Sequence, residues 1–292
     1  MSADIPVDFP WQKKKLRAGE SFLSYIDEGR GQPFVFLHGN PASSYLWRKI
    51  IPHILPYGRC IAPDLPGTGS SGRPDISYRF SDHEHYLEEF LENLGLQSMF
   101  LVVHDWGSAL GLNYASHHPD KINGIVLMEA MVRPWRWTDM PLLYRLGFSM
   151  LRTPILGEFM VYRLNVFLNV IMPGLTLRKL QAGEKKQYKT PFKKIRSRKP
   201  MLIWPRDIPI NGKPRDTQRV FEHISSFIQE TSIPKLLLYA EPGAILNKPA
   251  VSWCRQNMKN LKTVYLGKGY HFLQEDYPHR IGREITEWYR EI

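Results

Sequence analysis

The sequence predicts an α/β fold: a mostly parallel sheet of eight strands with helices on both faces and an inserted helical cap. Short apolar runs alternate with stretches of helical periodicity, and they predict the layered sheet because a strand buried on both faces reads as a continuous apolar run. The alternation stops for about a hundred residues after Glu129, which predicts the cap. Neither an internal repeat nor a low-complexity tract interrupts the chain.

The expected strands and helices follow one another along the chain. Two segments near the N-terminus, 13–16 and 21–26, are typical of an antiparallel hairpin that leads into the sheet. The apolar runs that we assign to buried strands are residues 34–37, 60–63, 99–103, 124–128, 235–240 and 263–266. Helical periodicity is clearest at residues 81–94, 107–117 and 278–290.

The insertion after Glu129 is rich in Trp, Phe, Met, Pro and basic residues and shows no strand periodicity. It is too long for a single crossover, and structureless loops of such length are uncommon in compact domains. We therefore expect a helical cap domain at residues 132–211 and a main domain formed by residues 1–131 and 212–292.

Composition places the chain among ordinary globular proteins, with a hydrophobic content of 43% that suffices for a sizeable core. No uncharged apolar run is long enough to span a membrane, and the N-terminus lacks the apolar region of a secretory signal. We therefore expect a cytoplasmic protein without a membrane partner. The two cysteines, Cys60 and Cys254, are too few for a disulfide framework or a thiolate metal site, so we expect both to be reduced core residues.

The net charge of +11 is concentrated between Arg178 and Arg219, where few acids interrupt the basic residues. A charge of this sign suits an anionic partner. However, neither a nucleic-acid motif nor aromatic interleaving accompanies it. We therefore interpret the segment as a solvated basic face and expect no nucleic-acid partner, with a polyanion or membrane-surface contact as the alternative.

A nucleophile is predicted where the 99–103 strand ends. There the sequence MFLVVHDWG, residues 99–107, passes from a strand through Asp105 into a helix. A strained strand-to-helix turn of this form, G-x-S-x-G in its common version, exposes a nucleophile at the end of a sheet. Asp105 takes the serine position, and Val103 stands in place of the first glycine. In the alternative interpretation, Asp105 only caps the helix that follows.

An aspartate at this position selects a different reaction from a serine. A carboxylate is ionised near neutral pH and attacks carbon without a base. Displacement at an alkyl carbon by a serine would leave an ether, which water cannot readily cleave, whereas displacement by a carboxylate leaves an ester that water can hydrolyse. Asp105 therefore indicates an alkyl substrate and a covalent ester intermediate.

Hydrolysis of such an ester needs a base that activates water. His271 lies in the loop directly after the last predicted strand, which is where this kind of fold places its base. We expect the other histidines to lie at the surface or in caps, with His38 and His104 as exceptions.

The base in turn needs an acid that fixes its tautomer and stabilises the imidazolium. Glu129 follows the 124–128 strand, beside the nucleophile strand, and is the favoured candidate. Glu241, at the end of the 235–240 strand, is the alternative.

A leaving group that departs as an anion needs hydrogen-bond donors in an apolar cavity. Trp106 has an indole N–H that can only donate, and Asn40, which follows the 34–37 strand, carries two amide donors. The backbone N–H groups of the same two residues are candidates for the oxyanion hole of ester hydrolysis. For Asn40 taken alone, a role in a turn is as good an interpretation as ligand binding, and for Trp106 a role in packing is.

At these residues the sequence resembles the haloalkane dehalogenases of the α/β-hydrolase superfamily, in particular the subgroup with an Asp-His-Glu triad and an Asn-Trp halide pair. The resemblance covers nearly the whole chain. It is carried by HGNPASSYLW at 38–47, PDLPGTGSSG at 63–72, HDWGSALG at 104–111, WPRDIP at 204–209, AEPGA at 240–244 and HFLQED at 271–276. Departures fall in the cap, at 134–137, 142–143 and 185–199, so the resemblance leaves substrate size open.

The resemblance implies hydrolysis of a small halogenated aliphatic substrate to an alcohol, halide and a proton, without a cofactor or metal, by a monomer or weak homo-oligomer. It implies that Asp105 is the nucleophile, His271 the base and Glu129 the acid, with Asn40 and Trp106 binding the halide. It also implies a cap-lined apolar pocket. For each lining residue, a role in the core is an equally good interpretation. The residues that we expect to line this pocket are Met140, Pro141, Phe148, Phe167, Ile171, Pro205, Ile208, Leu246 and Phe272.

Three other functions remain open. An epoxide hydrolase shares the aspartate turn but needs cap tyrosines and commonly has an aromatic residue where Asn40 stands. A coelenterazine-dependent luciferase can keep the same five polar residues, and light emission without halide release would identify it. A catalytically silent polyanion-binding protein would use the basic cap, and salt-sensitive binding without turnover would identify it.

Overall fold

A computed structural model describes residues 9–292; residues 1–8, which carry part of the argument about a secretory signal, lie outside the described residues. Eight strands form one sheet in the order β1-β2-β4-β3-β5-β6-β7-β8. β2 pairs antiparallel with β1 and β4, and the remaining pairs are parallel. The strands are β1 (Lys14–Ala18), β2 (Ser21–Glu28), β3 (Pro33–Leu37), β4 (Arg59–Pro63), β5 (Met99–Asp105), β6 (Ile122–Ala130), β7 (Lys235–Pro242) and β8 (Leu261–Gly269). The predicted fold class is confirmed.

Every apolar run assigned to a strand lies in one. The central strand β5 shows why, because all seven of its residues are buried. Its neighbours β3 and β6 are similarly covered, as expected for parallel strands with helices on both faces. The N-terminal hairpin β1–β2 attaches to the sheet through β4, as predicted.

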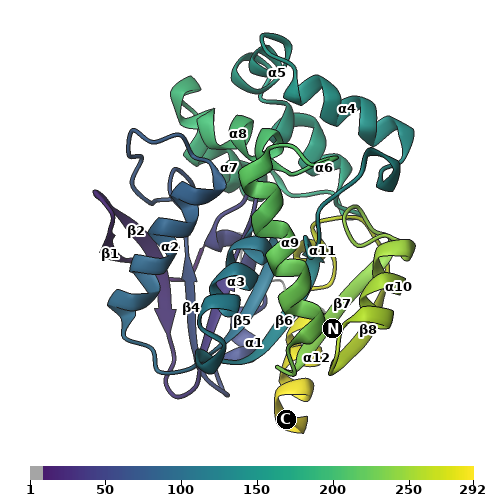
Figure 1. Cartoon of the computed structure of the whole chain (residues 1–292). Helices are drawn as coiled ribbons and strands as arrows, with labels where there is room; N and C mark the ends of the chain where they lie inside the picture. Colours follow the sequence, from purple (N-terminus) through teal and green to yellow (C-terminus); the bar gives the residue numbers. More distant parts are fainter. Residues whose placement is uncertain (1–8) are drawn as a thin grey trace.

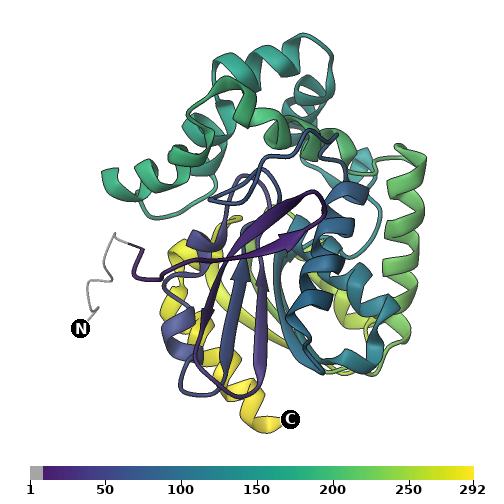
Figure 2. The ribbon, with the colours of Figure 1, turned by 90° about the vertical axis from the view of Figure 1, so that its left-hand side faces the viewer.

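Two helical layers enclose the sheet (Figures 1 and 2). One core cluster lies under α2, α3, α9 and α10, and the other under α1 and α12. The helices of this part of the chain are η1 (Ser44–Trp47), α1 (Ile51–Ile54), α2 (Phe80–Leu94), α3 (Trp106–His117), η2 (Pro119–Lys121), α9 (Arg215–Glu230), α10 (Lys248–Asn257), α11 (Leu273–Asp276) and α12 (Pro278–Glu291). Cys60 is buried in β4 and Cys254 in α10.

The segment between β6 and α9 forms a layer of short helices above one end of the sheet (Figure 2). Trp135 and Ile210 form an isolated parallel bridge where this segment leaves and rejoins the rest of the chain. We therefore propose residues 132–211 as a cap domain. Its helices are η3 (Trp137–Asp139), α4 (Leu142–Arg152), α5 (Leu156–Glu158), η4 (Phe159–Arg163), η5 (Phe167–Ile171), α6 (Met172–Gly174), α7 (Ala182–Lys189), η6 (Thr190–Phe192), η7 (Ile195–Arg198) and α8 (Lys199–Asp207).

The strands from β3 to β8 run parallel to one another, so their carboxyl ends share one edge of the sheet, and this edge lies beneath the cap (Figure 1). Residues that follow their carboxyl ends therefore meet in one place, as is usual for ligand sites of open α/β sheets. Across residues 9–292 no helix is both long and apolar enough to cross a membrane.

Candidate active site

The turn from β5 to α3 holds Asp105 in a strained backbone conformation. Its φ of 53° lies in the region that residues other than glycine rarely adopt. The turn is tight because α3 passes against the end of β3: a Cβ on Gly107 would lie 2.2 Å from the carbonyl oxygen of Leu37. Gly111, one turn further, leaves space for Val103, since a Cβ there would lie 2.8 Å from the Val103 Cγ1 atom. A glycine on the helix thus compensates for the valine that replaces the usual glycine on the strand.

The two carboxylate oxygens of Asp105 lie in different surroundings. Oδ1 accepts hydrogen bonds from the backbone N–H of Trp106, at 2.6 Å, and of Asn40, at 3.0 Å. Oδ2 lies 3.4 Å from Nε2 of His271. Gly39 permits this arrangement, because a Cβ on it would lie 2.1 Å from Oδ1.

His271 connects the aspartate to Glu129. Its Nδ1 atom lies 3.2 Å from Oε2 of Glu129, and both side chains are buried. The backbone N–H groups of His271 and Phe272 donate to the carbonyl oxygen of Leu175, a cap residue, each at 3.2 Å. The imidazole thus lies between two carboxylates in a loop that is fastened to the cap.

A β-bulge directs Glu129 towards the histidine. From Phe100 to His104, β5 pairs residue by residue with Gly124 to Met128 of β6. Asp105 then pairs with Ala130, so Glu129 has no partner on β5. Glu129 has a φ of 42° and its carboxylate accepts three backbone hydrogen bonds, all from one loop after β7, donated by Ala244, Ile245 and Leu246.

Glu241, the alternative acid, lies at the exposed end of β7. The part of the chain that the structure describes shows no hydrogen bond or ion pair from its side chain to His271, whose Nδ1 faces Glu129. The geometry therefore supports Glu129 over Glu241.

Electrostatics make Asp105 and His271 an ion pair. Burial alone would lower the pKa of His271, but hydrogen bonds and charges from Asp105 and Glu129 raise it to about 9. Burial alone would raise the pKa of Asp105, but the hydrogen bond and charge of His271, with the Trp106 amide, hold it below its usual value. At neutral pH the pair is therefore a carboxylate and an imidazolium.

Asn40 and Trp106 flank the same carboxylate. Trp106 is 1% exposed and packs against Trp204 of the cap, with ring centroids 4.5 Å apart. Within residues 9–292, no protein group accepts a hydrogen bond from the side-chain amide of Asn40 or from the Trp106 indole. Two donors beside Asp105 are thus available to a ligand. In the same residues, no group of three or more His, Cys, Asp or Glu side chains is arranged to hold a metal ion.

One expectation about the histidines is wrong. His83 is not a surface residue: it is fully buried in α2, where its ring stacks on Trp204 with centroids 3.9 Å apart. Burial lowers its pKa to about 3. Its burial depends on a cap residue that is distant in sequence, so the local pattern of α2 does not reveal it. His38 and His104 are buried, consistent with their expected exception from the surface class.

The expected pocket residues divide between the two sides of the site. Met140, Ile208 and Leu246 belong to one core cluster, whereas Phe167 and Phe272 belong to the other. Met140 and Leu246 also line a cavity of about 40 Å³ beside the loop that holds Glu129. Three of the set are not fully buried: Phe148 and Ile171 are half-buried and Pro141, which precedes α4, is exposed, while Pro205 is buried.

A buried charge cluster beside the His271 loop was not anticipated from the sequence. Glu275, in α11, accepts hydrogen bonds from Arg48, from Arg178 of the cap and from the Tyr188 hydroxyl. Glu184 of the cap pairs with Arg48 at 2.7 Å. The cluster fastens the cap to the segment that follows His271, and its members are too far apart in sequence for local patterns to reveal it.

Comparisons with known proteins identify relatives over nearly the whole chain. Residues 32–278 match the family described as alpha/beta hydrolase fold. The chain is 42% identical to a haloalkane dehalogenase of Mesorhizobium japonicum over 98% of its own length and 94% of the relative's. It is 41% identical to a haloalkane dehalogenase of Sphingobium indicum over 96% of each chain.

Solved structures of haloalkane dehalogenases are also similar to this chain. A putative ancestral haloalkane dehalogenase superimposes with a TM-score of 0.93 and 41% identity, covering 95% of this chain and 98% of the other. The haloalkane dehalogenase DbeA of Bradyrhizobium elkani gives a TM-score of 0.93 at 39% identity, covering 95% and 97%. With this level of identity over nearly its full length, the chain belongs to the haloalkane dehalogenase family of α/β-hydrolases.

Proposed function

We propose that this enzyme hydrolyses haloalkanes through a covalent ester on Asp105. The observation that carries the proposal is the different placement of the two Asp105 oxygens: Oδ1 accepts two backbone N–H groups, while Oδ2 faces the imidazole of His271. An N-cap alone would account for the bond to Trp106 but not for the buried histidine–glutamate pair behind it.

In the first step, Oδ2 of Asp105 attacks the carbon that bears the halogen. A carbon–oxygen bond forms, the carbon–halogen bond breaks, and its electron pair leaves with the halide. The side-chain N–H groups of Asn40 and Trp106 donate to the departing anion. Each hydrogen bond to a charged group contributes roughly 1.5–3 kcal/mol, so the loss of one donor slows displacement by about tenfold to a hundredfold.

In the second step, neutral His271 takes a proton from water, and the hydroxide attacks Cγ of the ester. The resulting negative charge develops on Oδ1, where the backbone N–H groups of Asn40 and Trp106 form the oxyanion hole. The bond between Cγ and the alkyl oxygen breaks, and the alkoxide takes the first water proton from His271 and leaves as the alcohol. The second water proton, on the new carboxyl group, passes to His271, which restores the carboxylate and the imidazolium. Glu129 fixes the tautomer of His271 and stabilises its protonated form.

The proposed substrate is a small halogenated aliphatic compound, bound beneath the cap at the carboxyl ends of the strands by the nine pocket residues predicted above. Each of these assignments is a proposal, as are the cytoplasmic location and the monomeric or weakly oligomeric state.

The test is bromide release from 1-bromobutane and 1,2-dibromoethane without added cofactor. We expect turnover by the native enzyme and about one bromide per active site from His271→Phe, with the alkyl mass retained on Asp105. His85→Phe, which changes an exposed histidine, serves as the matched control and should turn over normally. Absence of halide across short and medium chains, or light from coelenterazine without halide, would reject the proposal.

A second pair of variants decides the acid. Glu129→Gln should lose most turnover while retaining part of the bromide burst, because displacement does not need the base. Glu241→Gln changes an exposed carboxylate and should behave as the native enzyme. The reverse result would move the acid to Glu241.

A further inference from the structure

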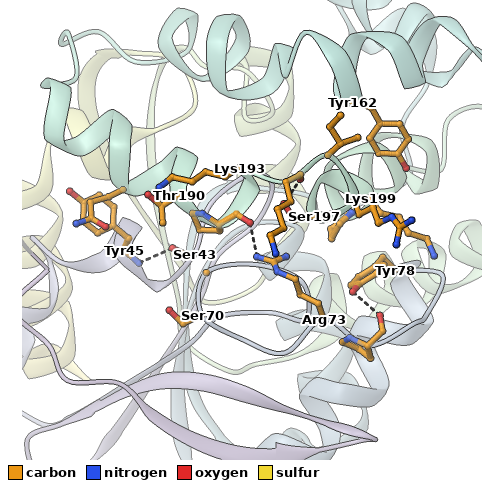
Figure 3. A pocket seen from close by; sticks show the side chains of 18 of the residues that line it. Ser43, Tyr45, Ser70, Arg73, Tyr78, Tyr162, Thr190, Lys193, Ser197 and Lys199 are labelled. Atoms are coloured by element: carbon orange, nitrogen blue, oxygen red, sulfur yellow. Dashed lines mark hydrogen bonds between the residues drawn. The ribbon is translucent and has the colours of Figure 1, made fainter.

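A second hollow, which we name the basic cleft, lies between the main domain and the cap and has a volume of about 1150 Å³. Ser43, Tyr45 and the loop from Gly69 to Tyr78 line it on the main-domain side, and Tyr162 and the segment from Gln187 to Pro200 line it on the cap side. Figure 3 shows Arg73 reaching from the first group towards the second. No residue assigned to the dehalogenation site lines the cleft.

The lining of the cleft is strongly cationic. The side chains in it that carry a charge near neutral pH are six basic residues and one carboxylate, Asp75. Of the basic residues, only Lys13 has a carboxylate partner in the described part of the chain, Asp64 at 2.5 Å. The remaining five are Arg73, Lys193, Lys194, Arg196 and Lys199.

Arg73 and Lys199 are held in the cleft without neutralisation. Arg73 donates to the carbonyl oxygens of Gly67 and of Pro191, which belongs to the cap. Lys199 donates to the carbonyl oxygen of Ile76 at 2.6 Å. Carbonyl groups orient these cations but carry no net charge, so the positive charge of both side chains is left for a ligand.

Lys193, Lys194 and Arg196 are exposed on the cap side of the same hollow. Between residues 9 and 292, none of their side chains makes a hydrogen bond or an ion pair. Like charges gathered in a cleft repel one another, and low-dielectric walls strengthen the field between them. An anion in the cleft would remove this repulsion.

We propose that the basic cleft binds a small anion with several linked phosphate groups. One phosphate is too small for a hollow of about 1150 Å³ and too weakly charged for five unneutralised cations. A chain of phosphates matches both the length and the charge of the lining. The Ser43 and Ser70 hydroxyls, both labelled in Figure 3, add neutral donors from the main domain.

Such a ligand would join the two halves of the molecule. Arg73 comes from the main domain, whereas Lys193, Lys194, Arg196 and Lys199 come from the cap, so one bound chain contacts both. Ligands that bind only the folded state raise its stability by mass action. At about a hundred times the dissociation constant, the melting temperature of a chain of this size should rise by about 5 °C.

The experiment is calorimetric titration of the purified enzyme with inorganic tripolyphosphate and with ATP, with sulfate at equal ionic strength as the comparison. We expect saturable binding of both polyphosphates with one ligand per chain, a rise in melting temperature, and weaker binding at higher salt. Tighter binding of ATP than of tripolyphosphate would add a base contact to the same site. Binding no stronger than that of sulfate would overturn the proposal.

Two triple variants separate the cleft from general charge. Lys193→Gln, Lys194→Gln and Arg196→Gln together should weaken tripolyphosphate binding by at least about tenfold. The control, Arg219→Gln, Lys248→Gln and Lys259→Gln, removes the same charge from exposed residues outside the cleft and should change binding by less than about twofold. Equal weakening by both triples would show that only net charge attracts the anion, and the proposal would be wrong.

Two further measurements ask whether DNA binds the basic cleft and whether the cleft acts independently of dehalogenation. A 20-base-pair DNA duplex presents phosphates separated by sugars; if it binds more tightly than tripolyphosphate, the small-ligand proposal is overturned. Both triples should release bromide at the native rate, because no residue of the proposed reaction is altered. A loss of bromide release in the cleft triple alone would contradict the separation of the two sites.

Discussion

The timing of proton release tests the ion pair in the active site directly. The overall reaction produces one proton, and the raised pKa of His271, about 9, means that the free enzyme already carries a proton there at pH 7.5. In the proposed mechanism, ester formation neutralises Asp105, whose Oδ2 lies 3.4 Å from Nε2 of His271. The imidazolium then loses one of the two carboxylates that stabilise it, and its pKa falls.

The size of this effect follows from the distance. Two unit charges 3.4 Å apart interact by about 5 kcal/mol at an effective dielectric constant of 20. Loss of that energy weakens proton binding by His271 by roughly three orders of magnitude or more, which is enough to bring its pKa below neutrality. The proton should therefore leave during the first step, and alkylation itself should generate the neutral base that the second step needs.

A stopped-flow measurement with a pH indicator in weak buffer, alongside rapid-quench bromide analysis, separates the two steps. At pH 7.5 we expect a burst of about one proton per active site at the rate of the bromide burst. As the pH rises through about 9, the proton burst should disappear, because His271 in the free enzyme is then neutral.

Two variants serve as controls for this measurement. His271→Phe should release bromide without a proton, and His85→Phe should behave as the native enzyme. The reasoning is refuted if, at pH 7.5, the native enzyme releases its proton only with the alcohol, or if His271→Phe also gives the proton burst.

Three further predictions concern the support of the site. Gly39→Ala places a methyl group 2.1 Å from Asp105 Oδ1 and should reduce bromide release by at least about a thousandfold. Gly147→Ala, with open space around it, is the control and should release bromide at the native rate. Equal activities of the two variants would contradict the close approach of Gly39 to the Asp105 carboxylate. Glu275→Gln removes a buried charge partner and should cost about 3–5 kcal/mol of stability, seen as a fall of about 6–9 °C in melting temperature; an unchanged melting temperature would refute the role of the cluster. Because the pKa of His271 is raised from 6.5 to about 9, its contribution to stability is complete below pH 6.5 and is lost as the pH rises through 9. The melting temperature should therefore fall more steeply between pH 6.5 and 9 in the native enzyme than in His271→Phe.

The sheet could be predicted from sequence because each of its central strands is buried on both faces. β5 illustrates this, since its apolar run is continuous and leads to Asp105, the proposed nucleophile. The helical insertion was predictable for the complementary reason, namely the absence of any such run. The individual cap helices are short, and their packing depends on contacts with the main domain that local periodicity does not encode.

The meeting of Asp105, His271 and Glu129 was predictable from the sequence, but its geometry was not. Each of these residues follows a strand that the pattern located, so topology alone brings the proposed nucleophile, base and acid to one end of the sheet. The bulge at Glu129 and the three backbone N–H groups that hold its carboxylate were not predictable, because neither depends on side-chain identity. The burial of His83 was missed for a related reason, since Trp204 lies in a different domain of the prediction.

The strain at Asp105 has a chemical consequence. In the proposed mechanism, the Asp105 carboxylate acts first as a nucleophile through one oxygen and then, as an ester, as the electrophile that water attacks. These two roles need opposite surroundings. The positive φ at the turn and the absence of a side chain at Gly39 allow two amides to reach Oδ1 while Oδ2 stays free of them. The amides hold the carboxylate in one orientation during attack and stabilise the oxyanion during hydrolysis, so the same two hydrogen bonds serve both steps. A freely rotating carboxylate would exchange its two oxygens and lose this division, which is why the turn at Asp105 must be rigid as well as exposed to the substrate.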